Sequence, residues 1–325
     1  MKLCPPGRPQ ALRHGTEGRS YPPVEEPKGA EASPSAGMAK NFAELLDRAL
    51  LDHRTFLTVG LDPRPGGIPA GVGGEELEAL RGFLLGIIEA TRDYCVAFKM
   101  QLASYLAFGP GGMDLLAEVR AVAARDRITI LDLKASDIPS TMELYRSAVL
   151  ERWGFDAMTV NPYLGWETIS AALKEDAKGL FVLLHTSNAG AQDFEERTVD
   201  GGPPLWRTMI PRLRELSMSG NIGAVVGATF PEALTEARQG LGTCVPLLVP
   251  GVGRQGGSLK DVLRSGRGES GGALLINASR SILEASRGSD WKEAAAAEAA
   301  HLTRAMRDLR PGPTGTASPA GPPPR

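Results

Sequence analysis

Hydrophobic runs of strand length alternate with amphipathic helical patterns along most of the chain. The helical stretches repeat apolar residues at intervals of three and four, as Leu80, Leu84 and Ile87 do within residues 75–94. Between such stretches lie eight short runs rich in aliphatic and β-branched residues, at 56–63, 96–103, 128–135, 156–163, 179–187, 222–229, 245–252 and 272–279. Strands that alternate with helices indicate βα units around a parallel sheet that is buried on both faces.

Eight βα units within about 250 residues match the size of a TIM barrel, the (β/α)8 fold of the α/β class. We therefore expect residues 38–310 to form one (β/α)8 barrel domain. An open, doubly wound sheet is the alternative, and periodicity alone does not distinguish the two folds.

The two ends of the chain differ from this pattern. Residues 1–37 and 311–325 are rich in Pro, Gly and Ser and show no sustained periodicity. Such segments cannot bury enough apolar surface to fold, so we expect a disordered extension at each end. Met38 directly precedes the helical pattern of residues 41–53 and is a candidate for the natural start of the chain.

Composition and charge narrow the kinds of partner. A formal net charge of -2 gives no global basic field that would attract nucleic acid or an acidic membrane, so an anionic ligand needs a local basic pocket. Cys4, Cys95 and Cys244 lie far apart, which argues against a disulfide framework or a structural zinc site. No apolar run approaches the roughly 20 residues of a membrane span. We expect a cytoplasmic protein that binds a small molecule.

Charged side chains gather where the first three predicted strands end. They are Asp62, Lys99, Asp132, Lys134 and Asp137. Active sites of TIM barrels lie at the C-terminal ends of the strands, and residues two apart share a face, so Asp132 and Lys134 should point into the barrel mouth. An ammonium held among carboxylates stays protonated, can stabilise a developing carbanion and can then donate a proton to it. This favours decarboxylation or enolate chemistry, and the alternative is a salt-bridge cluster that only compensates its own charges.

A second group of candidate residues follows the seventh and eighth predicted strands. The segments PGVGRQGG (250–257) and NASRS (277–281) lie where TIM barrels commonly bind phosphate through backbone N–H groups, and Arg280 would add a guanidinium. The glycines of the first segment also satisfy GxGxxG, typical of dinucleotide sites, but they fall in the seventh unit rather than the first. A tight turn alone is the other interpretation. His185 is the one histidine at a predicted strand end, and we assign it no catalytic role.

These motifs together resemble the orotidine 5′-phosphate decarboxylase family, and more narrowly its longer bacterial subgroup, type 2. The resemblance spans about residues 41–290 and includes motifs from nearly every predicted strand in the expected order. The motifs are VGLDP, AFK, Asp132-x-Lys134-x-x-Asp137-Ile138, TVNPYLG, HTSNAGA, VVGAT, LVPGVGRQGG and NASR. The resemblance implies a homodimeric TIM barrel that converts orotidine 5′-monophosphate to UMP and CO₂ in de novo pyrimidine biosynthesis, with neither a metal nor an organic cofactor.

The resemblance also implies catalytic roles for single residues. Lys134 would protonate C6 of the pyrimidine as the carboxylate departs, while Asp132 would press its charge against that carboxylate. Lys99 and Asp137 would complete the alternating array of charges and hold Lys134 in place. Asp62 and Lys99 would contact the ribose.

Further positions match the family's substrate contacts. Asp137 and Thr141 would reach in from the partner subunit, so the site would form only in the dimer. Gln255 and Arg280 would grip the phosphate, and Ser187 would contact the base.

The chain departs from the subgroup's pattern in the loop after the third strand. Ser136 and Pro139 stand where glycine is common, and Pro139 fixes φ and removes a hydrogen-bond donor, which leaves the loop geometry open. His185 stands where an arginine is common. Two other functions stay open. One is a Mg²⁺-dependent enzyme of the same superfamily, such as a keto-gulonate phosphate decarboxylase or a hexulose phosphate synthase, and the other is a barrel that binds a ligand without catalysis.

Overall fold

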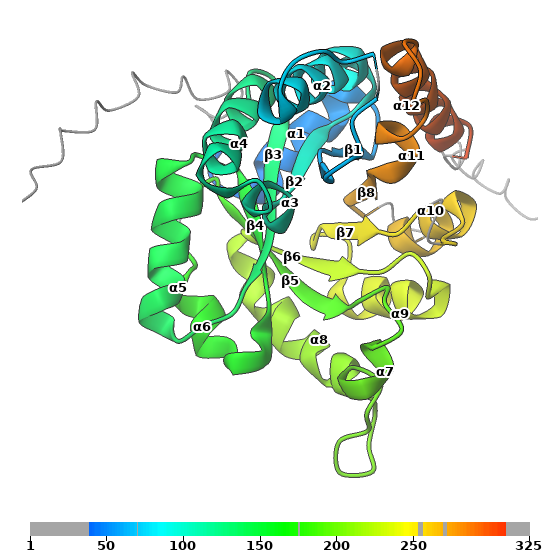
Figure 1. Ribbon diagram of the computed structural model, residues 1–325. Helices are drawn as coiled ribbons and strands as arrows, with labels where there is room; N and C mark the ends of the chain where they lie inside the picture. Colours follow the sequence, from blue (N-terminus) through cyan, green and yellow to red (C-terminus); the bar gives the residue numbers. More distant parts are fainter. Residues whose placement is uncertain (1–38, 70, 175, 253–255, 269–271, 310–325) are drawn as a thin grey trace, which may run out of the picture. The chain divides into compact units, whose positions relative to one another are not determined.

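The computed structural model describes residues 39–309, apart from residues 70, 175, 253–255 and 269–271. Its strands are β1 (Leu57–Gly60), β2 (Ala97–Gln101), β3 (Ile128–Ala135), β4 (Ala157–Val160), β5 (Gly179–His185), β6 (Ile222–Val226), β7 (Leu247–Pro250) and β8 (Leu274–Ala278). They are parallel and pair in sequence order, and β1 closes the barrel by pairing with β8 (Figure 1). Each strand lies within one of the eight predicted runs. The predicted TIM barrel is confirmed, and the open, doubly wound alternative is wrong.

Helices surround the barrel and connect its strands (Figure 1). The main helices are α1 (Phe42–His53), α2 (Glu76–Thr91), α4 (Gly109–Ala123), α5 (Pro139–Arg146), α6 (Trp166–Ala171), α8 (Leu205–Leu216), α9 (Pro231–Leu241), α10 (Leu259–Arg267) and α12 (Trp291–Asp308). Shorter helical segments are α3 (Leu102–Leu106), α7 (Ala191–Phe194), α11 (Arg280–Leu283), Arg92–Tyr94, Ser147–Arg152, Pro162–Leu164 and Ser217–Ser219. No helix in the described part is both long and apolar enough to cross a membrane.

Helix α1 closes the N-terminal end of the barrel. The side chain of Asn41 caps this helix by accepting a hydrogen bond from the Glu44 N–H at 3.0 Å. Phe42 packs edge-on against Phe181, with 5.7 Å between the ring centroids, and belongs to one buried cluster with Ile128 at the beginning of β3. Since α1 covers this end, a ligand has access to the barrel from the opposite end, where the strands finish.

The main hydrophobic core lies between the barrel and the surrounding helices. It includes Phe83 of α2 and Trp206 of α8, which are 3% and 1% exposed, as the helical pattern predicts. Phe83 also contacts Trp291 of α12, with 5.1 Å between the ring centroids, so the last helix packs against the first helix of the outer layer. The expected disordered ends, residues 1–37 and 311–325, lie outside the described residues, and the domain boundaries stay a prediction.

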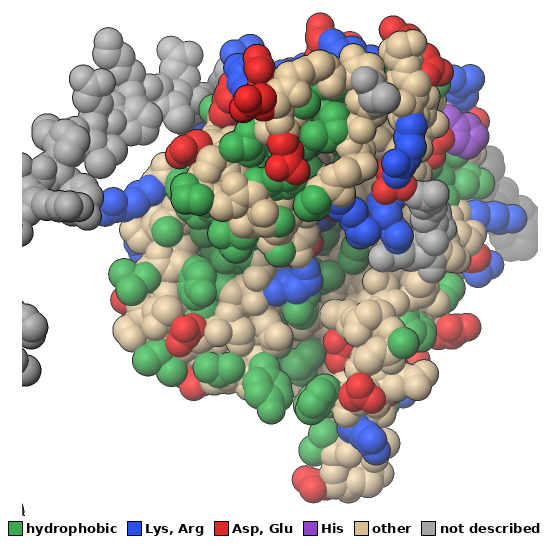
Figure 2. Space-filling model, viewed as in Figure 1, with side chains coloured by type: hydrophobic (Ala, Val, Ile, Leu, Met, Phe, Trp, Pro, Cys, Tyr) green, Lys and Arg blue, Asp and Glu red, His purple; other side chains and the backbone are tan. Residues whose placement is uncertain are grey.

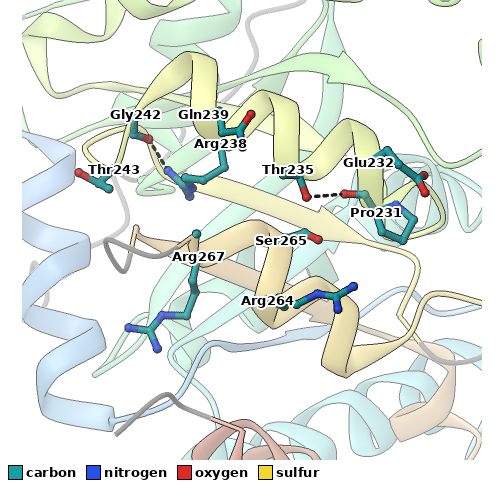
Figure 3. Close-up of a pocket in the computed structure, with 11 residues that line it drawn as sticks. Pro231, Glu232, Thr235, Arg238, Gln239, Gly242, Thr243, Arg264, Ser265 and Arg267 are labelled. Atoms are coloured by element: carbon teal, nitrogen blue, oxygen red, sulfur yellow. Dashed lines mark hydrogen bonds between the residues drawn. The ribbon is translucent and has the colours of Figure 1, made fainter. Parts of the chain in front are cut away.

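A cavity of about 670 Å³ lies on the outer wall between α9 and α10, where Arg238 extends from α9 toward α10 (Figure 3). The Nε of this buried arginine donates to the carbonyl of Gly266 at 2.6 Å, and its Nη atoms donate to the carbonyls of Gly242, Val245 and Ala273 at 2.7 Å. Gly266 and Gly242 lie at the C-terminal ends of α10 and α9, where carbonyls lack helical partners and the helix dipole favours a cation. Arg238 therefore joins two helix ends to the barrel wall.

We predict that Arg238→Met lowers the free energy of unfolding by roughly 3 kcal/mol or more, because several buried carbonyls lose a charged donor. The matched control is Arg264→Met, which lines the same cavity from α10, since Arg264 is exposed and pairs with Asp261 at 3.2 Å. That change should cost less than about 1 kcal/mol. Urea unfolding of both variants measures the difference, and equal losses would contradict the structural role of Arg238.

Candidate active site

The site is built on a break in the regular structure of β3. The pairing of β3 with β4 shifts register between Leu131 and Ala135. Within this interval Lys134 has φ 51°. This is the left-handed region, which residues other than glycine, asparagine and aspartate rarely adopt. Its backbone N–H donates to the side-chain oxygen of Thr159 on β4 at 2.9 Å. Non-glycine residues in this conformation cluster at functional sites, where the surrounding contacts hold them in place.

Four charged side chains form an alternating row at the ends of β1, β2 and β3. Asp132 lies between two ammonium groups, with 3.1 Å from its Oδ2 to Lys99 Nζ and 2.7 Å from its Oδ1 to Lys134 Nζ. Lys99 Nζ lies 3.5 Å from Asp62 Oδ1 on its other side. The row therefore reads Asp62, Lys99, Asp132, Lys134, so each inner charge contacts two opposite charges.

This arrangement keeps the inner pair of charges ionised. Burial alone would lower the pKa of Lys99, whose side chain is 4% exposed, but Asp62 and Asp132 raise that pKa above its ordinary value. Burial likewise opposes ionisation of Asp132, yet Lys99 and Lys134 bring its pKa well below the usual range. The Lys134 side chain is 43% exposed, so the outermost member of the row is an accessible ammonium.

A cavity of about 240 Å³ opens beside this row at the C-terminal end of the barrel. Its lining includes Lys134 and, from the ends of β7 and β8, Gly251 and Arg280. Figure 2 shows Lys or Arg side chains on two sides of a hollow near the middle of this face. The Ser279 hydroxyl donates to Asp62 Oδ2 at 2.6 Å, which fixes one wall. The cavity can therefore accept an anionic ligand that reaches from the guanidinium to the lysine–aspartate row.

The structure brings five of the nine predicted site residues to this cavity. They are Asp62, Lys99, Asp132, Lys134 and Arg280. Asp137, Thr141 and Ser187 are not among its lining residues in the single chain described, and Asp137 instead accepts a hydrogen bond from the next backbone N–H at 2.7 Å. Gln255 lies outside the described residues. The roles assigned to all nine residues stay predictions.

Sequence reasoning missed several residues of the site, among them Thr159 and Arg64. Thr159 donates its hydroxyl hydrogen to Asp132 Oδ1 at 2.9 Å, and Arg64 lines the cavity together with Arg280. A signal for Arg64 was its place directly after the VGLDP motif. Thr159 lies in the fourth predicted strand, but the register shift that brings its hydroxyl to Asp132 leaves no mark in the sequence pattern.

Two of the three departures noted in the sequence, Pro139 and His185, have structural explanations. Pro139 is the first residue of α5, where the missing N–H costs no hydrogen bond and the fixed φ suits a helix. His185 is fully buried, with its ring against Trp206 and Phe230 and its Nε2 2.6 Å from Glu196 Oε1. This agrees with a structural histidine. Among the described residues, no group of three or more His, Cys, Asp or Glu side chains is arranged to hold a metal ion.

A closed parallel barrel with a charged pocket at its C-terminal end defines the class as a TIM barrel whose candidate site lies where the active sites of this fold lie. The chain belongs to the Orotidine 5'-phosphate decarboxylase / HUMPS family, whose family model matches residues 55–297. The family resemblance seen in the sequence is therefore confirmed.

Individual relatives agree with this assignment. The chain is 39% identical to "Orotidine 5'-phosphate decarboxylase" of Bordetella petrii over 83% of this chain and 99% of that protein. It is also 39% identical to the protein of the same name from Thermomicrobium roseum, over 83% of this chain and 96% of the other. Among solved structures, UMP synthase of Leishmania donovani matches 84% of this chain with a TM-score of 0.74 and 32% identity. The chain spans 57% of the length of that synthase.

We predict a pH-dependent contribution of Asp132 to stability. Its folded pKa is lowered from an unfolded value of about 3.9, so ionised Asp132 stabilises the fold above pH 4, and this contribution declines as the pH falls toward the folded pKa. The difference in unfolding free energy between wild type and Asp132→Asn should therefore be steady near neutral pH and shrink below about pH 4. Urea unfolding across this range measures it.

The control for this measurement is Asp93→Asn, since the Asp93 side chain is 90% exposed. This variant should differ little from wild type at every pH. A difference for Asp132→Asn that is as large below pH 4 as at neutral pH would contradict the ionised, cation-held carboxylate.

Proposed function

We propose that this protein is an orotidine 5′-phosphate decarboxylase, which converts orotidine 5′-monophosphate to UMP and CO₂ in de novo pyrimidine biosynthesis. The observation that carries the proposal is Asp132 held between Lys99 and Lys134, with Lys134 open to a cavity that Arg280 also lines. The names of the relatives, which share most of their length with this chain, support the same activity.

The reaction follows from where the charges lie. The substrate phosphate binds Arg280, the ribose lies near Asp62 and Lys99, and the pyrimidine carboxylate lies near Asp132. The bond between C6 and the carboxylate breaks, CO₂ leaves, and the electron pair stays on C6 beside the Lys134 ammonium. Lys134 Nζ then donates a proton to C6 and regains one from water, to which its side chain is 43% exposed.

The charged side chains of the site are already in position before the reaction begins. Lys99 and Asp132 are held in place by their mutual contacts, so little reorganisation is needed when negative charge develops at C6. Phosphate binding at Arg280, remote from the reacting carbon, supplies binding energy that offsets the ordering of the substrate. This chemistry uses neither a metal nor an organic cofactor, which distinguishes it from the Mg²⁺-dependent sugar-phosphate enzymes of the superfamily.

We also propose a homodimer in which Asp137 and Thr141 complete the partner's site. Two observations support this. Neither residue lines the cavity of its own chain, and the adjacent hydrophobic side chains Ile138 and Leu144 are 56% and 69% exposed. Figure 2 shows further hydrophobic side chains over the face formed by α4, α5 and α6. Contact of this face with a second copy would bury these hydrophobic side chains and bring Asp137 of one subunit toward Lys134 of the other. A cytoplasmic location stays a prediction.

The activity is tested by the loss of orotidine 5′-monophosphate absorbance with purified protein. Wild type should turn over equally with and without EDTA, and Lys134→Ala should lose at least about 1,000-fold in kcat, because C6 loses its proton donor and its stabilising charge. The matched control is Lys292→Ala, which removes a lysine of similar exposure, 45% against 43%, paired with Glu89. That variant should keep wild-type activity.

Two outcomes would overturn the proposed function. Folded wild type that ignores this substrate but acts on a sugar phosphate with added Mg²⁺ would favour the related enzymes. Folded wild type that binds UMP without turnover of orotidine 5′-monophosphate would indicate a non-catalytic barrel.

The shared site is tested by mixing two inactive variants, Lys134→Ala and Asp137→Ala, under conditions that exchange subunits. Half of the random dimers are hybrids, and each hybrid has one site with both residues intact, so about a quarter of wild-type activity should return. Hybrids that form, as shown by differently tagged subunits, but remain inactive would contradict the shared site.

A further inference from the structure

The hydroxyl of Thr159 joins the two residues on which the proposed reaction depends. Thr159 lies on β4 and is 1% exposed. Its Oγ1 accepts the backbone N–H of Lys134 at 2.9 Å and donates its hydrogen to Asp132 Oδ1 at 2.9 Å. A hydroxyl has one hydrogen to donate and two lone pairs, so this one group serves both neighbours at once.

The backbone bond matters because Lys134 lies in the left-handed region at φ 51°, inside the register shift between β3 and β4. In a regular parallel ladder this N–H would bond to a carbonyl of the neighbouring strand. Here the Thr159 hydroxyl takes that role and satisfies a backbone donor that has left the ladder. The unfavourable conformation of Lys134 thus gains a specific stabilising partner.

The side-chain bond orients the carboxylate. Asp132 Oδ1 accepts hydrogen bonds from the Thr159 hydroxyl and the Lys134 ammonium, while Oδ2 lies 3.1 Å from Lys99 Nζ. Without Thr159, rotation of the carboxylate would alter its distances to both lysines. One hydroxyl therefore fixes the start of the Lys134 side chain and the anion that holds its end.

We propose that Thr159 is a positioning residue, whose hydroxyl holds the left-handed Lys134 backbone and the Asp132 carboxylate in the geometry that proton transfer requires. The inference rests on the proposed decarboxylase function. Thr159 itself does not line the cavity, so it acts through its two neighbours and should influence kcat far more than KM.

The test compares Thr159→Val, which keeps the branched shape but removes the hydroxyl, with Thr159→Ser, which keeps the hydroxyl. We expect kcat of the valine variant to fall about 10-fold to 100-fold, because small displacements of catalytic groups reduce the rate by factors of this size. Its KM should stay within about threefold of the wild-type value. The serine variant should recover most of the activity. If the valine variant does not fold, Thr159→Ala removes the same hydroxyl and carries the same expectation.

The matched control is Thr129→Val on β3. Thr129 is also fully buried and donates its hydroxyl to a carboxylate, Asp156 Oδ2, at the same 2.9 Å, but it lies near the beginning of the strand. This variant should lose stability and keep kcat. The inference is overturned if Thr159→Val keeps kcat within about twofold, or if Thr159→Ser is as impaired as Thr159→Val. An inactive wild type would instead overturn the proposed function.

Discussion

The contact of Asp132 with two lysines is the interaction on which the rest of the site depends. A lysine as buried as Lys99 is costly to keep charged, and the cost is offset only because carboxylates of two neighbouring strands contact its ammonium. The same carboxylate holds Lys134 at the cavity. Removing either inner member would leave the other with only one of its two opposite charges, so the stability of each charge depends on the whole row. The parallel barrel makes this possible, since it brings the ends of strands distant in sequence to one rim.

Other elements stabilise the fold away from this site. Helix α1 covers the N-terminal end of the barrel, and Arg238 joins the ends of α9 and α10 on the outer wall. Of the described non-glycine residues with a positive φ, Lys134 is the one that lies where the charges gather, and there Thr159 and Asp132 hold it in place. Rigid strands around that point allow one residue to be held in a conformation that it would not adopt alone.

Much of this architecture is predictable from sequence, and the reason is physical. Strands buried on both faces leave continuous apolar runs, so the sequence predicts all eight strands, and the fold places the site at their C-terminal ends. Asp132 and Lys134 do meet, although not as neighbours on a regular strand, because a register shift and a left-handed residue intervene. Such breaks depend on contacts between strands, which a linear pattern does not encode. For the same reason Thr159 was missed, and Asp137 and Thr141, predicted to act across a subunit boundary, do not reach the cavity of their own chain.

The measurement that tests the account most directly is a crystal structure of the protein with UMP bound. The account predicts the phosphate against Arg280, C6 of the base facing Lys134 Nζ, and Asp132 still in contact with both lysines. A second copy should lie across the mouth, with Asp137 of the partner subunit beside Lys134. A phosphate bound away from Arg280, or a divalent ion held by Asp62 and Asp132 with Lys134 turned away, would contradict it.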